Sequence, residues 1–104
     1  MADFVTVAKV NDLKPGEGKI VEANGKTIAL FNVDGKFHAI DNTCKHQGGP
    51  LGEGTCDGNI VTCPWHGWQY DVTTGINSAN PQVKVDTFEV KVEGDEVKVK
   101  AEWN

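Results

Sequence analysis

Two short clusters of metal-ligating residues lie in the middle of the sequence. Cys44 and His46 form the first, and Cys63 and His66 form the second after sixteen intervening residues. If the two loops that carry them face each other, two thiolates and two imidazoles converge. This donor set suits either a tetrahedral zinc ion or a two-iron cluster with cysteine on one iron and histidine on the other. Zinc fingers usually run Cys, Cys, His, His, so the interleaved order favours the cluster.

The two clusters resemble the Rieske 2Fe-2S motif, most closely in the run Cys63-Pro64-Trp65-His66-Gly67-Trp68. The likeness continues through Gly48-Gly49-Pro50-Leu51, Asp57-Gly58-Asn59-Ile60-Val61, Tyr70-Asp71 and Thr74-Gly75. It implies one 2Fe-2S cluster per chain, with Cys44, His46, Cys63 and His66 as its ligands. It also implies a single domain over residues 1–104, an all-β antiparallel sandwich with a cluster-binding subdomain inserted at about residues 43–70.

Glycines and prolines beside the ligands suit loops that wrap an anionic cluster. Bridging sulfides and thiolates attract backbone N–H donors, and glycine lets the backbone come close to them. We therefore expect Gly48, Gly49 and Gly67 to allow tight wrapping and several amide donors toward sulfur. Pro50 and Pro64 are expected to stiffen the entry and the exit of the loops.

The aromatic residues after the second cysteine suggest a cover and a contact face. We expect one of Trp65 and Trp68 to shield the cluster from water and the other to help form the face where a partner docks, with ordinary packing as the alternative. Pro81 lies where Rieske domains carry a loop that covers the cluster, although the family often has more proline there.

The resemblance also bears on the redox potential. High-potential Rieske proteins carry a disulfide between positions that match Gly49 and Trp65, and a serine at the position of Trp68. Neither the disulfide nor the hydroxyl donor is possible here. Fewer hydrogen bonds to sulfur favour the oxidised form, so we expect the low end of the Rieske range of about −150 to +300 mV. Tyr70 matches a tyrosine that donates to a ligand sulfur, which places the value above the lowest members.

Short alternating runs predict strands along the chain and a sandwich or barrel of many short strands. The predicted strands are 6–10, 19–22, 27–33, 36–40, 59–62, 87–93 and 96–100. Tight hairpin turns are predicted at Asn24-Gly25, Asp34-Gly35 and Asp57-Gly58, because these residues accept positive φ at low cost. Only residues 9–13 suggest a helical turn.

Composition restricts the partners and the compartment. A net charge of −5 argues against nucleic acid, and no apolar run is long enough to cross a bilayer, so no membrane anchor is expected. Acidity either steers the chain toward basic surfaces or serves only solubility. Cys56 is the one cysteine outside the clusters and is expected to be small and partly buried; with no secretory signal it predicts a reducing cytoplasm. His38 is expected at a half-buried strand position.

The resemblance implies a soluble ferredoxin that carries single electrons from a flavoprotein reductase to a terminal oxygenase, here an aromatic-ring hydroxylating dioxygenase. No catalytic residue and no small-molecule substrate are expected, because 104 residues leave no room for a substrate pocket with a second metal. Two alternatives stay open. One is the small Rieske subunit of an assimilatory nitrite reductase or another oxidoreductase complex, and the other is a zinc-bound binding module.

Overall fold

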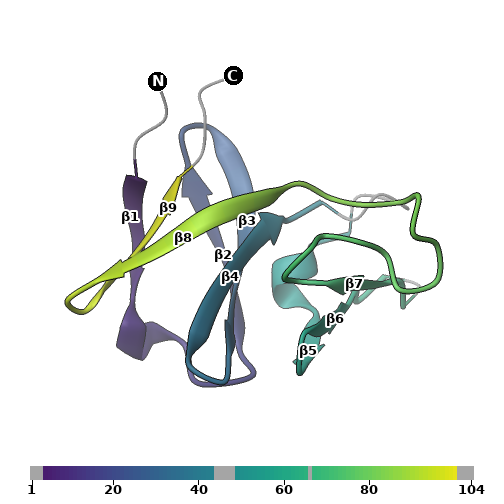
Figure 1. Cartoon of the computed structure of the whole chain (residues 1–104), viewed down its shortest axis with the longest axis horizontal. Coiled ribbons are helices and arrows are strands. Elements are labelled where there is room, and N and C mark those ends of the chain that lie inside the picture. The colour runs from purple at the N-terminus through teal and green to yellow at the C-terminus, as the bar shows by residue number, and fades with distance from the viewer. Residues whose placement is uncertain (1–3, 44–48, 66, 101–104) are drawn as a thin grey trace.

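The computed structural model describes residues 4–43, 49–65 and 67–100. Within these residues the chain forms nine β-strands and two short 3-10 helices, arranged in two antiparallel sheets of six and three strands (Figure 1). No helix in the described ranges is long and apolar enough to cross a membrane. The predicted all-β antiparallel fold is confirmed.

The larger sheet forms the base of the molecule and has the strand order β1-β9-β8-β4-β3-β2. Its strands are β1 (Phe4–Lys9), β2 (Gly18–Ala23), β3 (Lys26–Val33), β4 (Lys36–Asp41), β8 (Thr87–Glu93) and β9 (Glu96–Lys100). Where β4 meets β8, only two residue pairs join the strands, Ala39 with Phe88 and Ile40 with Thr87. The base is therefore one six-stranded sheet with two three-stranded halves, β1-β9-β8 and β4-β3-β2.

The two halves of the base share one hydrophobic core. Ile28 and Leu30 of β3 pack in the same buried cluster as Val97 and Val99 of β9, and all four side chains are inaccessible to water. Alternation places charged residues on the other face of β9, whereas the other face of β3 carries Ala29 and Phe31, which are buried in a second cluster. Burial of this shared face holds the halves together as a sandwich.

The predicted turns fix the register of the hairpins. Asn24 and Gly25 have φ values of 52° and 81°, and Asp34 and Gly35 have 52° and 90°, as the tightest hairpin turns require. The buried Asn32 supports the second turn, because its Oδ1 accepts a 2.8 Å hydrogen bond from the Gly35 N–H. These two turns join β2 to β3 and β3 to β4.

The smaller sheet contains β5 (Thr55–Asp57), β6 (Ile60–Thr62) and β7 (Gln69–Asp71), in that order. The strand predicted at 59–62 is confirmed as β6. A second buried cluster joins this sheet to the base, since Phe31 and Ile40 pack with Val61 and Tyr70. Figure 1 shows the three short strands beside the base, with the β7–β8 connection running around them.

The two 3-10 helices are η1 (Val10–Asp12) and η2 (Leu51–Glu53). The helical turn predicted at 9–13 is confirmed as η1, and the Lys9 N–H donates a 2.9 Å hydrogen bond to Asp12 Oδ2 at its start. Helix η2 follows the first predicted ligand loop and connects it to β5.

Candidate functional site

Cys63 is the predicted ligand whose position the structure describes. It follows β6 and is 2% exposed. Its backbone N–H donates a 2.7 Å hydrogen bond to the Trp68 carbonyl, which closes residues 63–68 into a loop between β6 and β7. Cys44, His46, Gly48 and His66 lie outside the described residues, so the four-ligand set stays a prediction.

The first ligand loop is anchored at both of its ends. Thr43 and Pro50 form an antiparallel bridge, and the Leu51 N–H donates a 2.8 Å hydrogen bond to the Asn42 carbonyl. The buried Asn42 side chain adds a further tie, because its Oδ1 accepts a 2.7 Å bond from the Gly52 N–H. The loop between residues 43 and 50 therefore begins and ends on paired backbone.

The two ligand loops meet at Gly49. An ideal Cβ built on this buried glycine would lie 2.6 Å from Cys63 Sγ and 3.2 Å from both Cβ and Cγ of Trp65. Gly49 therefore lies close to the Cys63 sulfur, while its approach to the cluster stays a prediction. Gly67 serves its own loop differently, because its φ is +75° and an added Cβ meets none of the described atoms within 4 Å. Glycine suits position 67 because of this backbone conformation and not because space is short.

The Cys63 sulfur receives one of the expected amide donors. The Trp65 N–H points to Cys63 Sγ with a donor–acceptor distance of 3.4 Å. A thiolate ligand of an iron–sulfur cluster accepts hydrogen bonds of this kind, and they tune the potential. One end of such a cluster fits here, because the Cys63 sulfur is buried, accepts an amide N–H and faces Gly49, which has no side chain.

The two tryptophans differ in exposure. Trp65 is 48% exposed, whereas Trp68 is half-buried and packs against the cluster of core residues that contains Cys63 and Tyr70. This difference agrees with separate roles in contact and in shielding, which remain predictions. Tyr70 is fully buried near the same core. Its hydrogen bond to a ligand sulfur also stays a prediction.

The connection between β7 and β8 lies beside the second ligand loop. The Ser78 N–H donates a 2.9 Å hydrogen bond to the Gln69 carbonyl. The Oδ1 of the buried Asn77 accepts hydrogen bonds of 2.8 and 3.0 Å from the backbone N–H groups of Ala79 and Asn80. A cavity of about 430 Å³ opens between this connection and the loop. It is lined by Gly67, Trp68, Gln69, Asn77, Ser78, Ala79 and Asn80. Pro81 follows directly and is exposed, and its role stays a prediction.

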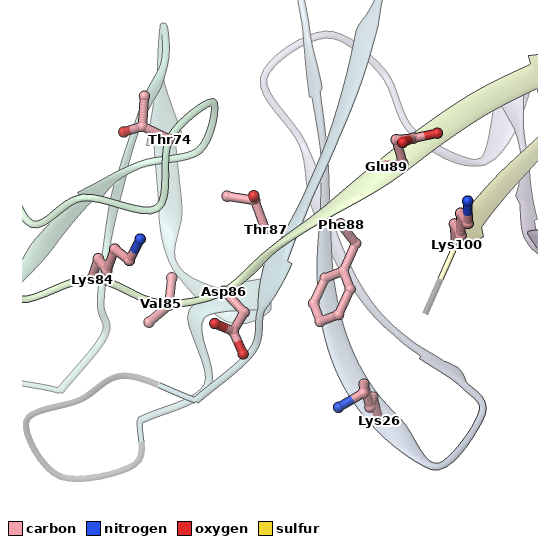
Figure 2. Close-up of a pocket in the computed structure, with 9 residues that line it drawn as sticks. All are labelled: Lys26, Thr74, Lys84, Val85, Asp86, Thr87, Phe88, Glu89 and Lys100. Atoms are coloured by element: carbon pink, nitrogen blue, oxygen red, sulfur yellow. The ribbon is translucent and has the colours of Figure 1, made fainter. Parts of the chain in front are cut away.

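A larger cavity of about 620 Å³ lies at the junction of the base and the smaller sheet (Figure 2). Five of its nine lining residues are charged: Lys26, Lys84, Asp86, Glu89 and Lys100. Figure 2 shows the three lysines spread around Phe88 rather than converging on one point. The arrangement suits a solvated groove.

Cys56 and His38 take the positions expected of them. Cys56 is half-buried on β5, and burial raises the pKa of its thiol, with the Asp57 carboxylate raising it further. The thiol is therefore protonated at neutral pH and unreactive. His38 is half-buried in β4, paired with Phe31. Among the described residues, no group of three or more His, Cys, Asp or Glu side chains could hold a metal ion.

Asn42 and Asn77 are the site-forming residues that sequence patterns did not single out. Each has a buried side-chain oxygen that fixes a loop next to the site. For Asn77 the following turn was an available signal, since asparagine often bonds the backbone two or three residues on. The Asn42 bond reaches Gly52, ten residues further on, so no local pattern reveals it.

Comparison with known proteins agrees with this geometry. The family model described as "Rieske [2Fe-2S] domain" matches residues 3–98. The ferredoxin component of the naphthalene 1,2-dioxygenase/salicylate 5-hydroxylase systems of a Ralstonia species is 35% identical over 96% of this chain and 97% of its own length.

Solved structures extend the likeness to the fold. A chain from the complex of reduced oxygenase and oxidized ferredoxin in carbazole 1,9a-dioxygenase has a TM-score of 0.84 and 36% identity, over 91% of this chain and 99% of that one. A putative NADH-dependent nitrite reductase small subunit from Mycobacterium tuberculosis has a TM-score of 0.90 at 23% identity, over 97% and 96%, which is a likeness of fold alone. On the family match and the relative's identity, the chain belongs to the Rieske [2Fe-2S] domain family.

Proposed function

We propose that this protein is a one-electron carrier whose 2Fe-2S cluster is ligated by Cys44 and Cys63 on one iron and by His46 and His66 on the other. The observation that carries the proposal is the buried Cys63 sulfur, which accepts the Trp65 amide at the point where the two ligand loops meet. When bound, the cluster supplies a site that takes up and releases one electron.

The chain's own residues set how readily the electron is held. Burial of Cys63 keeps water from its sulfur, and the Trp65 amide would stabilise the additional negative charge of a reduced cluster. Neutral imidazoles in place of thiolates at the second iron favour reduction further. We propose that His46 and His66 lie outermost, as in the family, and that an imidazole edge is the route to a partner.

We propose a flavoprotein reductase as the electron donor and a terminal oxygenase, an aromatic-ring hydroxylating dioxygenase, as the acceptor. The support is that relatives are named as ferredoxin components of dioxygenase systems and that a structural neighbour was solved together with an oxygenase. The chain is the electron-transfer component and not the catalyst. We propose that it works in the cytoplasm, which the protonated and unpaired Cys56 suits.

The cavity beside Trp68 is the surface proposed to contact the oxygenase. It adjoins the second ligand loop, and all seven lining residues are uncharged in a chain of which 24% is charged. Exposed Trp65 belongs to the same loop. Aromatic and amide groups give contacts with little charge to desolvate. The net negative charge of the chain would then affect only the approach of the partner, while the residues that contact the oxygenase are uncharged.

Reconstitution tests the proposal. The purified chain would be combined with NADH, a flavoprotein reductase and an aromatic-ring hydroxylating dioxygenase, and product formation would be followed. We expect turnover to require the chain and to rise with its concentration until the oxygenase is saturated. Full turnover without the chain would contradict the carrier role. Copurification in a fixed complex with a nitrite reductase large subunit would replace the shuttle by the nitrite reductase alternative.

A further inference from the structure

Three asparagines are buried in the described part of the chain: Asn32, Asn42 and Asn77. The side-chain oxygen of each accepts a hydrogen bond from a backbone N–H group. Asn32 and Asn77 bond the chain two or three residues on, whereas Asn42 bonds Gly52, ten residues on. Two of the four predicted cluster ligands lie between Asn42 and Gly52. This bond therefore spans the segment that carries half of the proposed ligand set.

Asn42 also provides the hydrogen-bond partners for the start of helix η2. The first N–H groups of a helix have no partner within it, and a buried N–H without a partner costs stability. In η2 these groups belong to Leu51 and Gly52, which are both buried. The Asn42 carbonyl accepts the Leu51 N–H at 2.8 Å, and Asn42 Oδ1 accepts the Gly52 N–H at 2.7 Å. Pro50, the residue before the helix, makes no such side-chain bond, so Asn42 caps η2 from across the ligand loop.

The stem that Asn42 closes leads to the sulfur of the second ligand loop. Thr43 and Pro50 form an antiparallel bridge between Asn42 and η2. Gly49, the next residue toward the loop, lies close to Cys63 Sγ. On its other side, the Asn42 N–H donates a 3.2 Å hydrogen bond to a carbonyl of β3. Asn42 thus connects the base sheet with both ends of the first ligand loop.

We propose that Asn42 is a positioning residue for the cluster: its side-chain oxygen holds the start of η2 against the end of β4 and so fixes the two ends of the first ligand loop. This inference rests on the proposed function, because it takes Cys44, His46 and Cys63 as ligands. A loop whose ends are held together has fewer conformations, so its ligands lose less entropy when they bind the cluster.

An Asn42→Ala variant removes the acceptor and leaves the buried Gly52 N–H without it, while the backbone bond to Leu51 stays possible. The stem then opens more readily, and the cluster leaves faster. Partners that orient metal ligands typically contribute about 10- to 100-fold to metal affinity. A bond on the stem lies one step further from the ligands, so we expect the low end, about tenfold.

An Asn42→Asp variant tests whether the acceptor oxygen is what matters. It keeps an oxygen at the same place, and hydrogen bonds from N–H groups stabilise an ionised carboxylate. The rate of cluster loss is therefore expected to stay close to that of the wild-type protein.

Asn32 offers a matched control in the base. Its Oδ1 accepts the Gly35 N–H at 2.8 Å, and its Nδ2 donates to the Leu13 carbonyl at 2.9 Å. Asn32 lies beside the turn that joins β3 to β4, at the opposite end of this hairpin from Asn42. Asn32→Ala therefore breaks buried bonds of the same kind away from both ligand loops, and lowers stability without changing the ligands.

The test uses the cluster-loaded wild-type protein and these three variants. The rate at which visible absorption bleaches in excess chelator is measured well below the lowest Tm, together with the paramagnetic resonance g values after reduction and the Tm. We expect Asn42→Ala to lose the cluster about tenfold faster, with shifted g values. Asn42→Asp is expected to restore both properties, and Asn32→Ala to lower the Tm while keeping both.

Several outcomes would overturn the inference. Cluster loss from Asn42→Ala at the wild-type rate, equal acceleration in Asn32→Ala, or loss from Asn42→Asp as fast as from Asn42→Ala would each show that the Asn42 oxygen does not hold the ligand loop. Loss of the β-sheet signal in far-UV circular dichroism for Asn42→Ala would also contradict it, because Asn42 would then support the whole fold. A wild-type protein that holds no cluster would instead refute the proposed function.

Discussion

Two cavities of the described structure differ sharply in charge. The hollow beside Trp68 is lined by uncharged residues, mostly amides and small side chains, and adjoins the second ligand loop. The groove around Phe88 is lined mostly by charged residues and lies at the junction with the base (Figure 2). Of these two cavities, the one that adjoins the second ligand loop is the uncharged one. The charged groups of the base can keep the acidic protein soluble, while a neutral face binds partners briefly.

The largest effect is expected from removing the thiol at the redox end. We predict that Cys63→Ala abolishes cluster binding, because it deletes a ligand from a buried site. Cys56→Ala is the matched control, since that thiol lies half-buried on β5 and is not one of the predicted iron ligands. Iron and acid-labile sulfide per chain measure both. Equal iron content in the two variants would contradict the assignment of Cys63.

A charge placed in the neutral hollow is expected to weaken partner binding. Ser78→Asp puts a carboxylate among uncharged residues that lose their water when the oxygenase binds. A desolvation penalty of about 1.4 kcal/mol would weaken the affinity for the oxygenase about tenfold. Thr87→Asp places the same charge in the charged groove and should change affinity less than about twofold. Affinity measured by titration calorimetry compares them. A larger effect of Thr87→Asp would move the docking face to the groove.

Salt dependence distinguishes a neutral contact from a charged one. We expect affinity for the oxygenase to change less than about threefold between about 50 and about 500 mM NaCl, because screening affects only charge pairs that lie apart from the contact. A decline of several orders of magnitude would show that acidic side chains make the contact themselves.

Tyr70 tests whether a hydroxyl donor reaches the ligand sulfur. If it donates as the family match predicts, Tyr70→Phe removes a bond of about 1 kcal/mol and lowers the potential by on the order of 40 mV. Redox titration measures the change, and the Tm reports the accompanying loss of stability. An unchanged potential would restrict Tyr70 to packing in the core, where it is fully buried.

The smallest effect is expected on the charged base. The 2.9 Å bond from Lys98 lowers the pKa of Glu93 and raises that of Lys98, but Glu93 is exposed to water and Lys98 is only half-buried. Because the folded-state pKa of Glu93 is lowered, its contribution is present above the unfolded value of 4.5 and is lost as pH falls through the folded value. Glu93→Gln should leave the Tm at neutral pH nearly unchanged and flatten its decline in acid. A large loss at neutral pH would contradict this.

Much of the base could be predicted because its signals are local. Asn24-Gly25 and Asp34-Gly35 accept positive φ at low cost and adopt it here, and alternation over 96–100 defines β9. The short strands β5 and β7 were missed, because three residues are too few to show a period and their pairing depends on β6. The approach of Gly49 to Cys63 joins residues far apart in sequence, so no local pattern reveals its distance.

The most direct test of the account is the low-temperature paramagnetic resonance spectrum of the purified protein before and after dithionite. A red-brown oxidised form that becomes paramagnetic on reduction, with an average g value below ~2, is the predicted result and would establish the two-cysteine, two-histidine cluster. A colourless and silent protein with stoichiometric zinc, even after reconstitution with iron and sulfide, would contradict the electron carrier and support the zinc-bound binding module.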